Sequence, residues 1–258
     1  MLVKILAFSY RNWIFAKRNI FAFFELLFWP VVSLISIGLM GSFLKLDYNL
    51  LNFVLTGSIA GGVLQVTQLD VSYGLLYDVW SKSIKHTFLS PITHFHFVMG
   101  SWLIGIIRGI IVFVLMTTFS YYVFEFSIPP SVLMTVVFFI GLCLSSLIIG
   151  MMVCLLIMLY GQRVEATAWA SATLIMLVCG IYYPVSYLPN FVRILSQLVP
   201  LTYFLEYYRS GYGFTPVFPN SLLWGFGLSI FYIILLFYSL GRAYEKSRKT
   251  GMILRLSE

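Results

Sequence analysis

Six long stretches of this chain are almost free of charged residues, and their length limits the possible folds more than any other feature. The shortest has 17 residues, and a helix of about 20 apolar residues crosses the hydrocarbon core of a bilayer. None of them alternates apolar and polar residues, as the strands of a membrane barrel do. Backbone groups in lipid need partners within the chain, so we predict six transmembrane helices. The stretches cover residues 21–44, 50–73, 97–124, 132–160, 167–183 and 221–240.

The composition agrees with a membrane environment. Hydrophobic residues make up 60% of the 258 residues and charged residues 10%, with a mean hydropathy of +0.95. A soluble domain carries about 25% charged residues, so this chain has too few to keep a folded surface in water. The predicted fold class is an all-α, polytopic membrane protein.

The distribution of Lys and Arg predicts the orientation of these helices. An even number of spans puts both termini on one side, and twelve of the sixteen Lys and Arg residues fall on that side. Basic loops remain in the cytoplasm, so we expect a multi-pass protein of the cell (inner) membrane with both termini cytoplasmic. The net charge of +7 then reflects topology and contact with anionic membrane lipid, and nucleic acid is not an expected partner.

Motifs that carry enzyme chemistry are missing from the sequence. It has no phosphate-binding Walker motif, dinucleotide fingerprint, zinc-protease motif or nucleophile elbow. The histidines His86, His94 and His96 share one inner loop, but the last two would point to different faces of a helix. The three cysteines lie in apolar runs without metal-like spacing. We therefore expect neither catalytic residues nor a metal site in this chain.

The first twenty residues predict an amphipathic helix. Apolar residues recur at helical spacing on one face, while Lys4, Arg11 and Arg18 lie toward another. The charges throughout this segment and the absence of a cleavage site argue against a signal peptide. We expect residues 1–20 to lie in the cytoplasmic interface of the membrane; the alternative is that they extend the first span. The apolar face consists of Leu2, Ile5, Leu6, Tyr10, Trp13 and Ile14.

The cytoplasmic connection at residues 74–97 contains a second amphipathic pattern. Trp80, Ile84, Phe88 and Leu89 recur about every four residues among polar ones. A short helix is predicted here, and it should end near Pro91 because the residue before a proline avoids the helical conformation. Such a helix can lie on lipid or dock into a groove of a soluble partner, and the pattern fits both.

Prolines frame the outer segment at residues 184–213. After Pro189 the apolar residues follow helical spacing until Pro200, over a length of roughly 16 Å, which is too short to cross the membrane. A second short helical piece follows, in which Glu206 and Arg209 lie one turn apart and could pair. Tyrosines are frequent, as at membrane surfaces. We predict two short re-entrant helices that enter the outer leaflet and return.

With these features, the sequence resembles the membrane subunit of ABC-2 type exporters, a permease family with drug, polysaccharide and lipid exporters. The resemblance covers essentially the full chain. It rests on the amphipathic N-terminus, "ELLFWPVV" (25–32), "LSPI" (89–92) and above all "YYPVSYLPNFVRILSQLVPLTYFLEYYR" (182–209). Many relatives have a more acidic, glycine-containing stretch where this chain reads "KSIKHTFLSP" (82–91).

The resemblance implies an architecture and partners. It implies a six-span domain over residues 21–258, ending in a basic cytoplasmic tail at 241–258, and a second permease copy, taken as a homodimer. It also implies two cytoplasmic ATPase subunits, which would hold ATP and magnesium. The inner loop would form a coupling helix on the ATPase, with Asp78, Trp80, Lys82, Lys85, Phe88 and Pro91 as candidate contacts. The outer segment would gate the exit through Tyr183, Pro184, Pro189, Pro200, Tyr203, Glu206 and Arg209.

Polar residues within the predicted spans are further candidates, because a charge at mid-depth costs about 2.5 to 3.5 kcal/mol on insertion scales. Arg108 is expected to pair with Asp70 or with Glu25, to contact substrate, or to reach the membrane surface. Gln65 and Gln68 share a helical face that could line a pore or meet the second permease.

The expected function is that of a permease subunit in an ATP-driven exporter. It would move an amphiphilic, lipid-linked or drug-like substrate out of the cytoplasm, with hydrolysis on a separate subunit. The alternative is a secondary transporter or a channel-like protein without an ATPase partner. A secondary transporter more often shows internal repeats, broken midplane helices and ion-coupling carboxylates, and the sequence shows no convincing repeat.

Overall fold

The computed structural model describes residues 1–18, 20–127 and 131–250. Within these ranges the chain forms α-helices, two short 3-10 helices and turns, and no strand. The α-helices are α1 (Leu2–Arg18), α2 (Ile20–Phe43), α3 (Tyr48–Trp80), α4 (Ile84–Leu89), α5 (His94–Phe124), α6 (Val132–Tyr160), α7 (Thr167–Val178), α8 (Asn190–Ser196), α9 (Pro200–Ser210) and α10 (Ser221–Thr250). The 3-10 helices are η1 (Gly161–Val164) and η2 (Val185–Tyr187).

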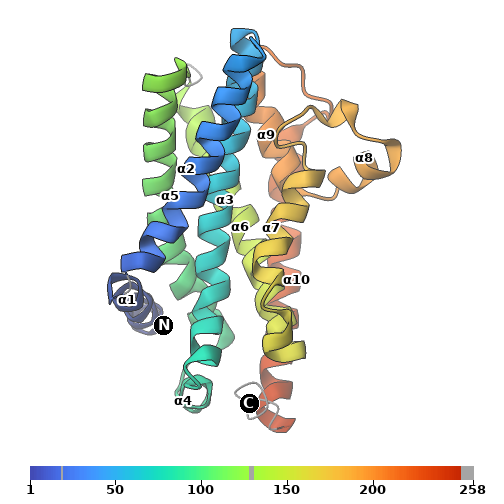
Figure 1. The fold of residues 1–258 in the computed structure, drawn as a ribbon. Helices are drawn as coiled ribbons and strands as arrows, with labels where there is room; N and C mark the ends of the chain where they lie inside the picture. The colour runs from blue at the N-terminus through green and yellow to red at the C-terminus, as the bar shows by residue number, and fades with distance from the viewer. Residues whose placement is uncertain (19, 128–130, 251–258) are drawn as a thin grey trace.

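The long helices run side by side in one bundle (Figure 1). The N-terminus, α1, α4 and the end of α10 lie at one end of the bundle, which we call the inner end. Helices α8 and α9 lie toward the other end, the outer end, beside the upper part of α7. The bundle therefore separates the two segments to which the sequence analysis assigned coupling and gating.

Four of the described helices are long and apolar enough to cross a membrane: α3, α5, α6 and the part Ser221–Ser247 of α10. Two shorter apolar helices are Leu27–Phe43, within α2, and Thr167–Val178, which is α7. Each of the six predicted apolar stretches thus forms a helix, while length and composition establish four candidate spans.

Two predicted boundaries were wrong. The second stretch was expected to end at residue 73, but α3 continues to Trp80 because Leu75, Leu76 and Val79 are buried against neighbouring helices. Asp78 and Trp80 therefore belong to a long helix instead of a loop. The fifth stretch was expected to reach residue 183, but α7 ends at Val178, just before Gly180, which turns the chain with φ of 72°.

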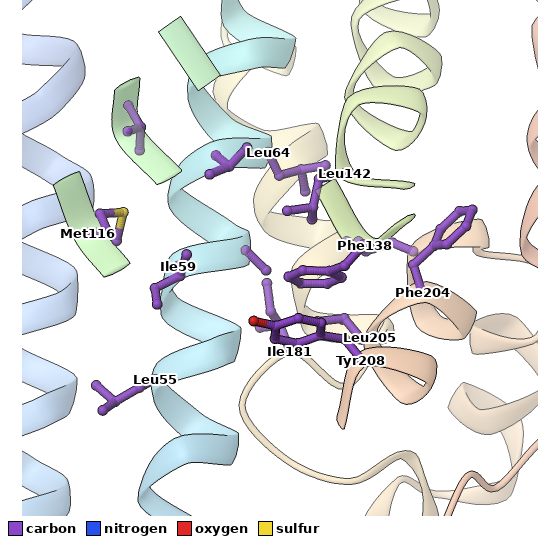
Figure 2. Packing of buried hydrophobic residues seen from close by; sticks show 14 of the residues in the cluster. Leu55, Ile59, Leu64, Met116, Phe138, Leu142, Ile181, Phe204, Leu205 and Tyr208 are labelled. Atoms are coloured by element: carbon purple, nitrogen blue, oxygen red, sulfur yellow. The ribbon is translucent and has the colours of Figure 1, made fainter. Parts of the chain in front are cut away.

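Helix α3 lies at the centre of the bundle. In its most apolar window 78% of the residues are buried, against 17% in that of α10. One apolar cluster surrounds the inner half of α3 and includes Phe8, Leu76 and Tyr244. A second surrounds the outer half, where Phe138 of α6 stacks on Tyr208 of α9 with ring centroids 4.2 Å apart (Figure 2). The outer segment is thus packed into the membrane body.

Helix α5 approaches α3 closely because a glycine faces it. A Cβ atom at Gly105 would lie 2.9 Å from the backbone oxygen of Thr67. The Thr67 hydroxyl donates to the Gly105 carbonyl at 3.2 Å. This close approach brings the polar residues of the two helices within reach of each other.

The predicted N-terminal helix is confirmed as α1, and its buried face carries Phe8, Ser9 and Asn12. Ser9 donates to the Gly100 carbonyl of α5 at 2.8 Å, and Asn12 donates to the Ser101 hydroxyl at 2.9 Å. The predicted apolar face points away from the protein, with Leu2, Leu6, Tyr10 and Trp13 all exposed.

Candidate functional site

The most connected polar group at the inner end is the carboxylate of Asp78. Its side chain is only 4% exposed. Nη1 of Arg11 donates to both of its oxygens, at 2.7 Å and 2.9 Å. The Ser83 hydroxyl donates to the same carboxylate at 3.0 Å and the Thr87 hydroxyl at 2.9 Å. One buried carboxylate therefore joins α1, the end of α3 and α4, and we call this set of bonds the inner clasp.

A second attachment holds the other end of the inner loop. Helix α4 ends at Leu89, as predicted from Pro91. Nζ of Lys4 donates to the Pro91 carbonyl at 2.7 Å, and the Tyr244 hydroxyl of α10 donates to the Ile92 carbonyl at 2.7 Å. The loop containing α4 is therefore fixed at both ends.

The described side chains exposed around α4 are both apolar and charged. Leu89 is 83% exposed and Trp80 is 40% exposed, and Lys82 is also exposed. The Trp80 indole donates to Glu165 of the α6–α7 connection at 3.1 Å. Ile84, on the opposite face of α4, is fully buried. The side chains of two candidate contacts, Lys85 and Phe88, are outside the described part of the structure.

The candidate ion pair in the middle of the bundle is present. Nη1 of Arg108 on α5 lies 2.5 Å from Oδ1 of Asp70 on α3. Both residues are buried, with exposed fractions of 6% for Arg108 and 9% for Asp70. Of the two proposed partners of Arg108, the structure thus shows Asp70; the side chain of Glu25 lies outside the described residues.

The structure separates the two glutamines that the sequence placed on one face. Gln68 is fully buried and donates to the Ala168 carbonyl of α7 at 2.8 Å. Gln65 is half-buried and borders a cavity of about 270 Å³ between α2, α3 and α7. Ser33, Ser58 and Tyr182 also line this cavity.

At the outer end, the guanidinium of Arg209 is the central polar group. Arg209 is 4% exposed. It donates to the carbonyl of Gly180 at 2.8 Å, to that of Phe53 at 3.2 Å and to that of Ile181. Its guanidinium carbon lies 3.5 Å from the centroid of the Phe53 ring. This arrangement, the outer clasp, joins α9 to α3 and to the turn after α7.

The predicted pairing of Glu206 with Arg209 was wrong. Both side chains are described, and no ion pair joins them. Oε2 of Glu206 instead accepts from the backbone N–H of Phe218 at 3.1 Å. Glu206 lies in α9, outside the candidate spans, and burial raises the pKa of its carboxyl above the ordinary value of 4.5. Both residues line a cavity of about 330 Å³ near Pro184.

The other candidate gate residues define the shape of the outer segment. Pro184 and Pro189 directly precede η2 and α8, and Pro200 begins α9. Tyr183 donates to the Leu177 carbonyl, and Tyr203 donates to that of Gln197 at 2.9 Å. The two predicted short helices are present, although α8 has only seven residues.

The partners of the Asp78 carboxylate were not predicted from the sequence. Arg11 was assigned to the polar face of α1, and Ser83 and Thr87 were not singled out. A weak signal exists for the serine and threonine, because they lie five and nine residues after Asp78. No local pattern pointed to Arg11, which is 67 residues away from Asp78.

Two comparisons with known proteins bear on this arrangement. A family model described as "ABC-2 type transporter" matches residues 3–212. An uncharacterized protein of Archaeoglobus fulgidus is 59% identical over 46 residues, which make up 18% of this chain and 72% of that protein.

Proposed function

Since this chain belongs to the ABC-2 type transporter family, as the permease component of an ABC transporter, we propose that it exports an amphiphilic substrate, lipid-linked or drug-like, from the cytoplasm. The force would come from a separate ATPase subunit, which binds ATP and magnesium. The supporting observation is the anchored helix α4 at the end opposite to α8 and α9 (Figure 1).

In the proposed mechanism, two ATPase subunits act on two permease copies. Closure of the ATPase pair on ATP pushes on α4 of each permease. Through its clasp to the end of α3, the central helix, α4 shifts the bundle between two packed conformations of similar energy. This chain hydrolyses nothing and supplies the path, for which the cavity beside Gln65 is the candidate contact with substrate or with the second copy.

The proposed topology has six crossings, with α2 and α7 as the remaining two. Helix α2 has 24 residues, or roughly 36 Å at 1.5 Å per residue, enough for the bilayer core. Helix α7 has 12 residues, and we propose that η1 and the turn at Gly180 complete its crossing. The exposed apolar face of α1 would lie in the inner interface of the cell membrane, with both termini cytoplasmic.

Cysteine labelling tests this topology. Leu89 and Tyr187 are 83% and 82% exposed at opposite ends of the bundle, and the native cysteines Cys143, Cys154 and Cys179 are buried. A membrane-impermeant maleimide should label Y187C in intact cells and L89C only in inverted vesicles. Labelling of L89C from outside would contradict the proposed orientation.

Co-purification tests the exporter function. We expect an ATPase subunit to co-purify with the tagged chain and its hydrolysis in lipid vesicles to depend on an intact inner loop. The variant L89D, which places a charge at an apolar position of α4 that is 83% exposed, should lose the partner. Vectorial transport by the purified chain without an ATPase would instead support the secondary transporter.

A further inference from the structure

We infer that Asp78 is a positioning residue that locks α4 to α1 and α3, so that these elements move together, and that it is not a contact of the ATPase partner. This inference rests on the proposed function in one respect, which is that α4 is taken as the helix on which the partner acts. It replaces the expectation that Asp78 itself docks on the ATPase.

Burial and saturation of the carboxylate exclude a docking role in this conformation. The Asp78 side chain is 4% exposed, whereas that of Arg11 is 28% exposed and covers it from the side of α1. Both carboxylate oxygens already accept two hydrogen bonds each, one from Arg11 and one from Ser83 or Thr87. A partner's cation could reach the carboxylate only after the clasp had opened.

The donors to the carboxylate come from two different elements, α1 and the segment of α4. Arg11 also donates to the Gly74 carbonyl of α3 at 3.1 Å, so α1 is tied to two successive turns at the end of α3. Ser83 precedes α4 and Thr87 lies within it. The carboxylate therefore bonds both to the start and to the middle of α4.

The attachment at the far end of α4 makes the unit rigid. Lys4 of the same helix α1 donates to the Pro91 carbonyl, so α1 holds the inner loop on both sides of α4. Helix α1 is itself fixed to α5 through Ser9 and Asn12. A push on the exposed Leu89 is thus transmitted to α1, α3 and α5 at once. Without the carboxylate, α4 loses the bonds at its start and middle and gains freedom to tilt, while the Lys4–Pro91 bond still holds the far end of the loop.

A distance measurement between α1 and α4 tests the inference without any partner. Spin labels at Y10C and L89C use positions that are 67% and 83% exposed, in the full chain in lipid nanodiscs. The control variant is D47N, because Asp47 precedes the other end of α3 and makes no side-chain cap hydrogen bond. We expect one narrow distance distribution in the parent and in D47N, and a broad or shifted one in D78N. An unchanged distribution in D78N would overturn the inference.

Milder variants cover the possibility that D78N does not fold. S83A combined with T87V removes two neutral donors and leaves the Arg11–Asp78 ion pair. R11K keeps the charge but loses the planar fork that bonds Asp78 and Gly74 together. We expect each to broaden the distribution less than D78N, and D78E to restore part of the order by returning the charge. If the α1–α4 distance distribution of every one of these variants equalled that of the parent, a positioning role for Asp78 would be contradicted.

Adding the co-purified ATPase distinguishes positioning from docking. We expect the D78N permease to retain the ATPase partner. The factor by which the permease stimulates ATP hydrolysis should fall roughly tenfold, which corresponds to about 1.4 kcal/mol of lost coupling. Loss of the partner in D78N with an unchanged α1–α4 distance would make Asp78 a docking contact, against the inference. If no ATPase binds the parent chain, the proposed function fails, and the distance measurement still decides whether Asp78 positions α4.

Discussion

The two ends of the bundle are each held by an arginine, and the two arginines are satisfied in different ways. At the inner end, Arg11 bonds the carboxylate of Asp78, a side chain of opposite charge. It also donates to the Gly74 carbonyl and lies over the Phe8 ring, as Arg209 does over the Phe53 ring, so the difference lies in the charged partner. At the outer end, Arg209 bonds backbone carbonyls of Phe53, Gly180 and Ile181 and stacks on an aromatic ring. The inner clasp consists of hydrogen bonds between side chains. The outer clasp consists of hydrogen bonds from the Arg209 side chain to backbone carbonyls.

This difference indicates different mechanical roles. A charge pair with a partly exposed member can open and reform while each group gains water, so the inner clasp suits an end that receives a push. The carbonyls of Gly180 and Ile181 beside Arg209 lie outside the helices, and leaving a buried carbonyl unbonded is costly. The outer clasp therefore suits a part that moves as a rigid unit.

The largest expected effect comes from breaking the outer clasp with R209L. The carbonyls of Gly180 and Ile181, which lie after the end of α7, would lose a buried charged donor, and each unsatisfied group costs about 1 to 3 kcal/mol. We expect the greatest loss of stability of any variant discussed here, measured as the melting midpoint with a thiol-reactive dye that reports exposure of the buried cysteines.

The matched variant R209K keeps the charge at the outer clasp. Its ammonium cannot reproduce the planar fork that reaches carbonyls on two segments, so we expect it to recover only a minor part of the loss. Full recovery in R209K would show that charge alone holds the outer end, and the contrast between the two ends would disappear.

The second largest effect is expected for the ion pair in the middle of the bundle. Removing one partner of a buried pair costs about 3 to 5 kcal/mol, so D70N and R108L should each lower the melting midpoint strongly. Charge reversal at both positions, D70R with R108D, should restore part of the stability and function lost in either single variant. Failure of this rescue would contradict a mainly electrostatic role for the pair.

These arginines also show which part of the site the sequence could predict. Asp70 was one of two predicted ion-pair partners of Arg108, beside substrate contact and an approach to the membrane surface, because an isolated charge in a span needs a partner. The partners of Arg209 were missed because backbone carbonyls carry no signature in the sequence, and the nearest acid, Glu206, was a misleading choice. Arg11 was missed because only the packing of α1 on α5 brings it to Asp78.

The fold was more predictable than the site for a physical reason. Apolar length and proline positions act locally, so they predicted the helices, the end of α4 before Pro91 and the two short helices α8 and α9. Helix α3 extends beyond its predicted end because its last turns are buried by other helices, and burial by distant segments is not visible in a local pattern. The same limit explains why Asp78 was assigned to a surface.

The third prediction tests the inner clasp with salt. R11L removes the partly exposed member of the pair and leaves the Ser83 and Thr87 bonds to the buried carboxylate, so we expect a loss of about 1 to 2 kcal/mol, smaller than for R209L. Because salt screens partly exposed charges, raising the salt concentration should narrow the difference in melting midpoint between parent and R11L. The difference between parent and R209L should not depend on salt. A salt-dependent effect at Arg209 would remove the distinction between the two clasps.

The fourth prediction concerns pH at the outer end. Burial raises the pKa of Glu206, so the folded state binds the proton more tightly than the unfolded state, and protonation stabilises the fold. This contribution is complete below the ordinary pKa of a glutamate and is lost as the pH rises through the raised pKa. Between about pH 4 and pH 7, the melting midpoint of the parent should therefore fall relative to that of E206Q.

A matched change checks that the pH effect belongs to Glu206. E125Q alters an exposed carboxylate, at the end of α5, and should leave the pH dependence of the parent in place. A parallel pH dependence in the parent and E206Q would mean that other groups set it and that Glu206 contributes nothing.

The smallest expected effect is at Lys82, in the turn between α3 and α4. Its φ of 56° is left-handed, which costs a residue with a side chain about 1 kcal/mol. K82G relieves this strain but gives the unfolded chain about as much extra freedom, so stability should change by no more than about 0.5 kcal/mol.

K82A keeps the strain and removes the charge, which separates backbone geometry from docking on the ATPase. If Asp78 sets the position of α4, both variants keep the narrow distance between α1 and α4, and K82A lowers only the affinity for the partner. A broadened distance in K82G alone would show that this turn, and not the carboxylate, holds the inner end.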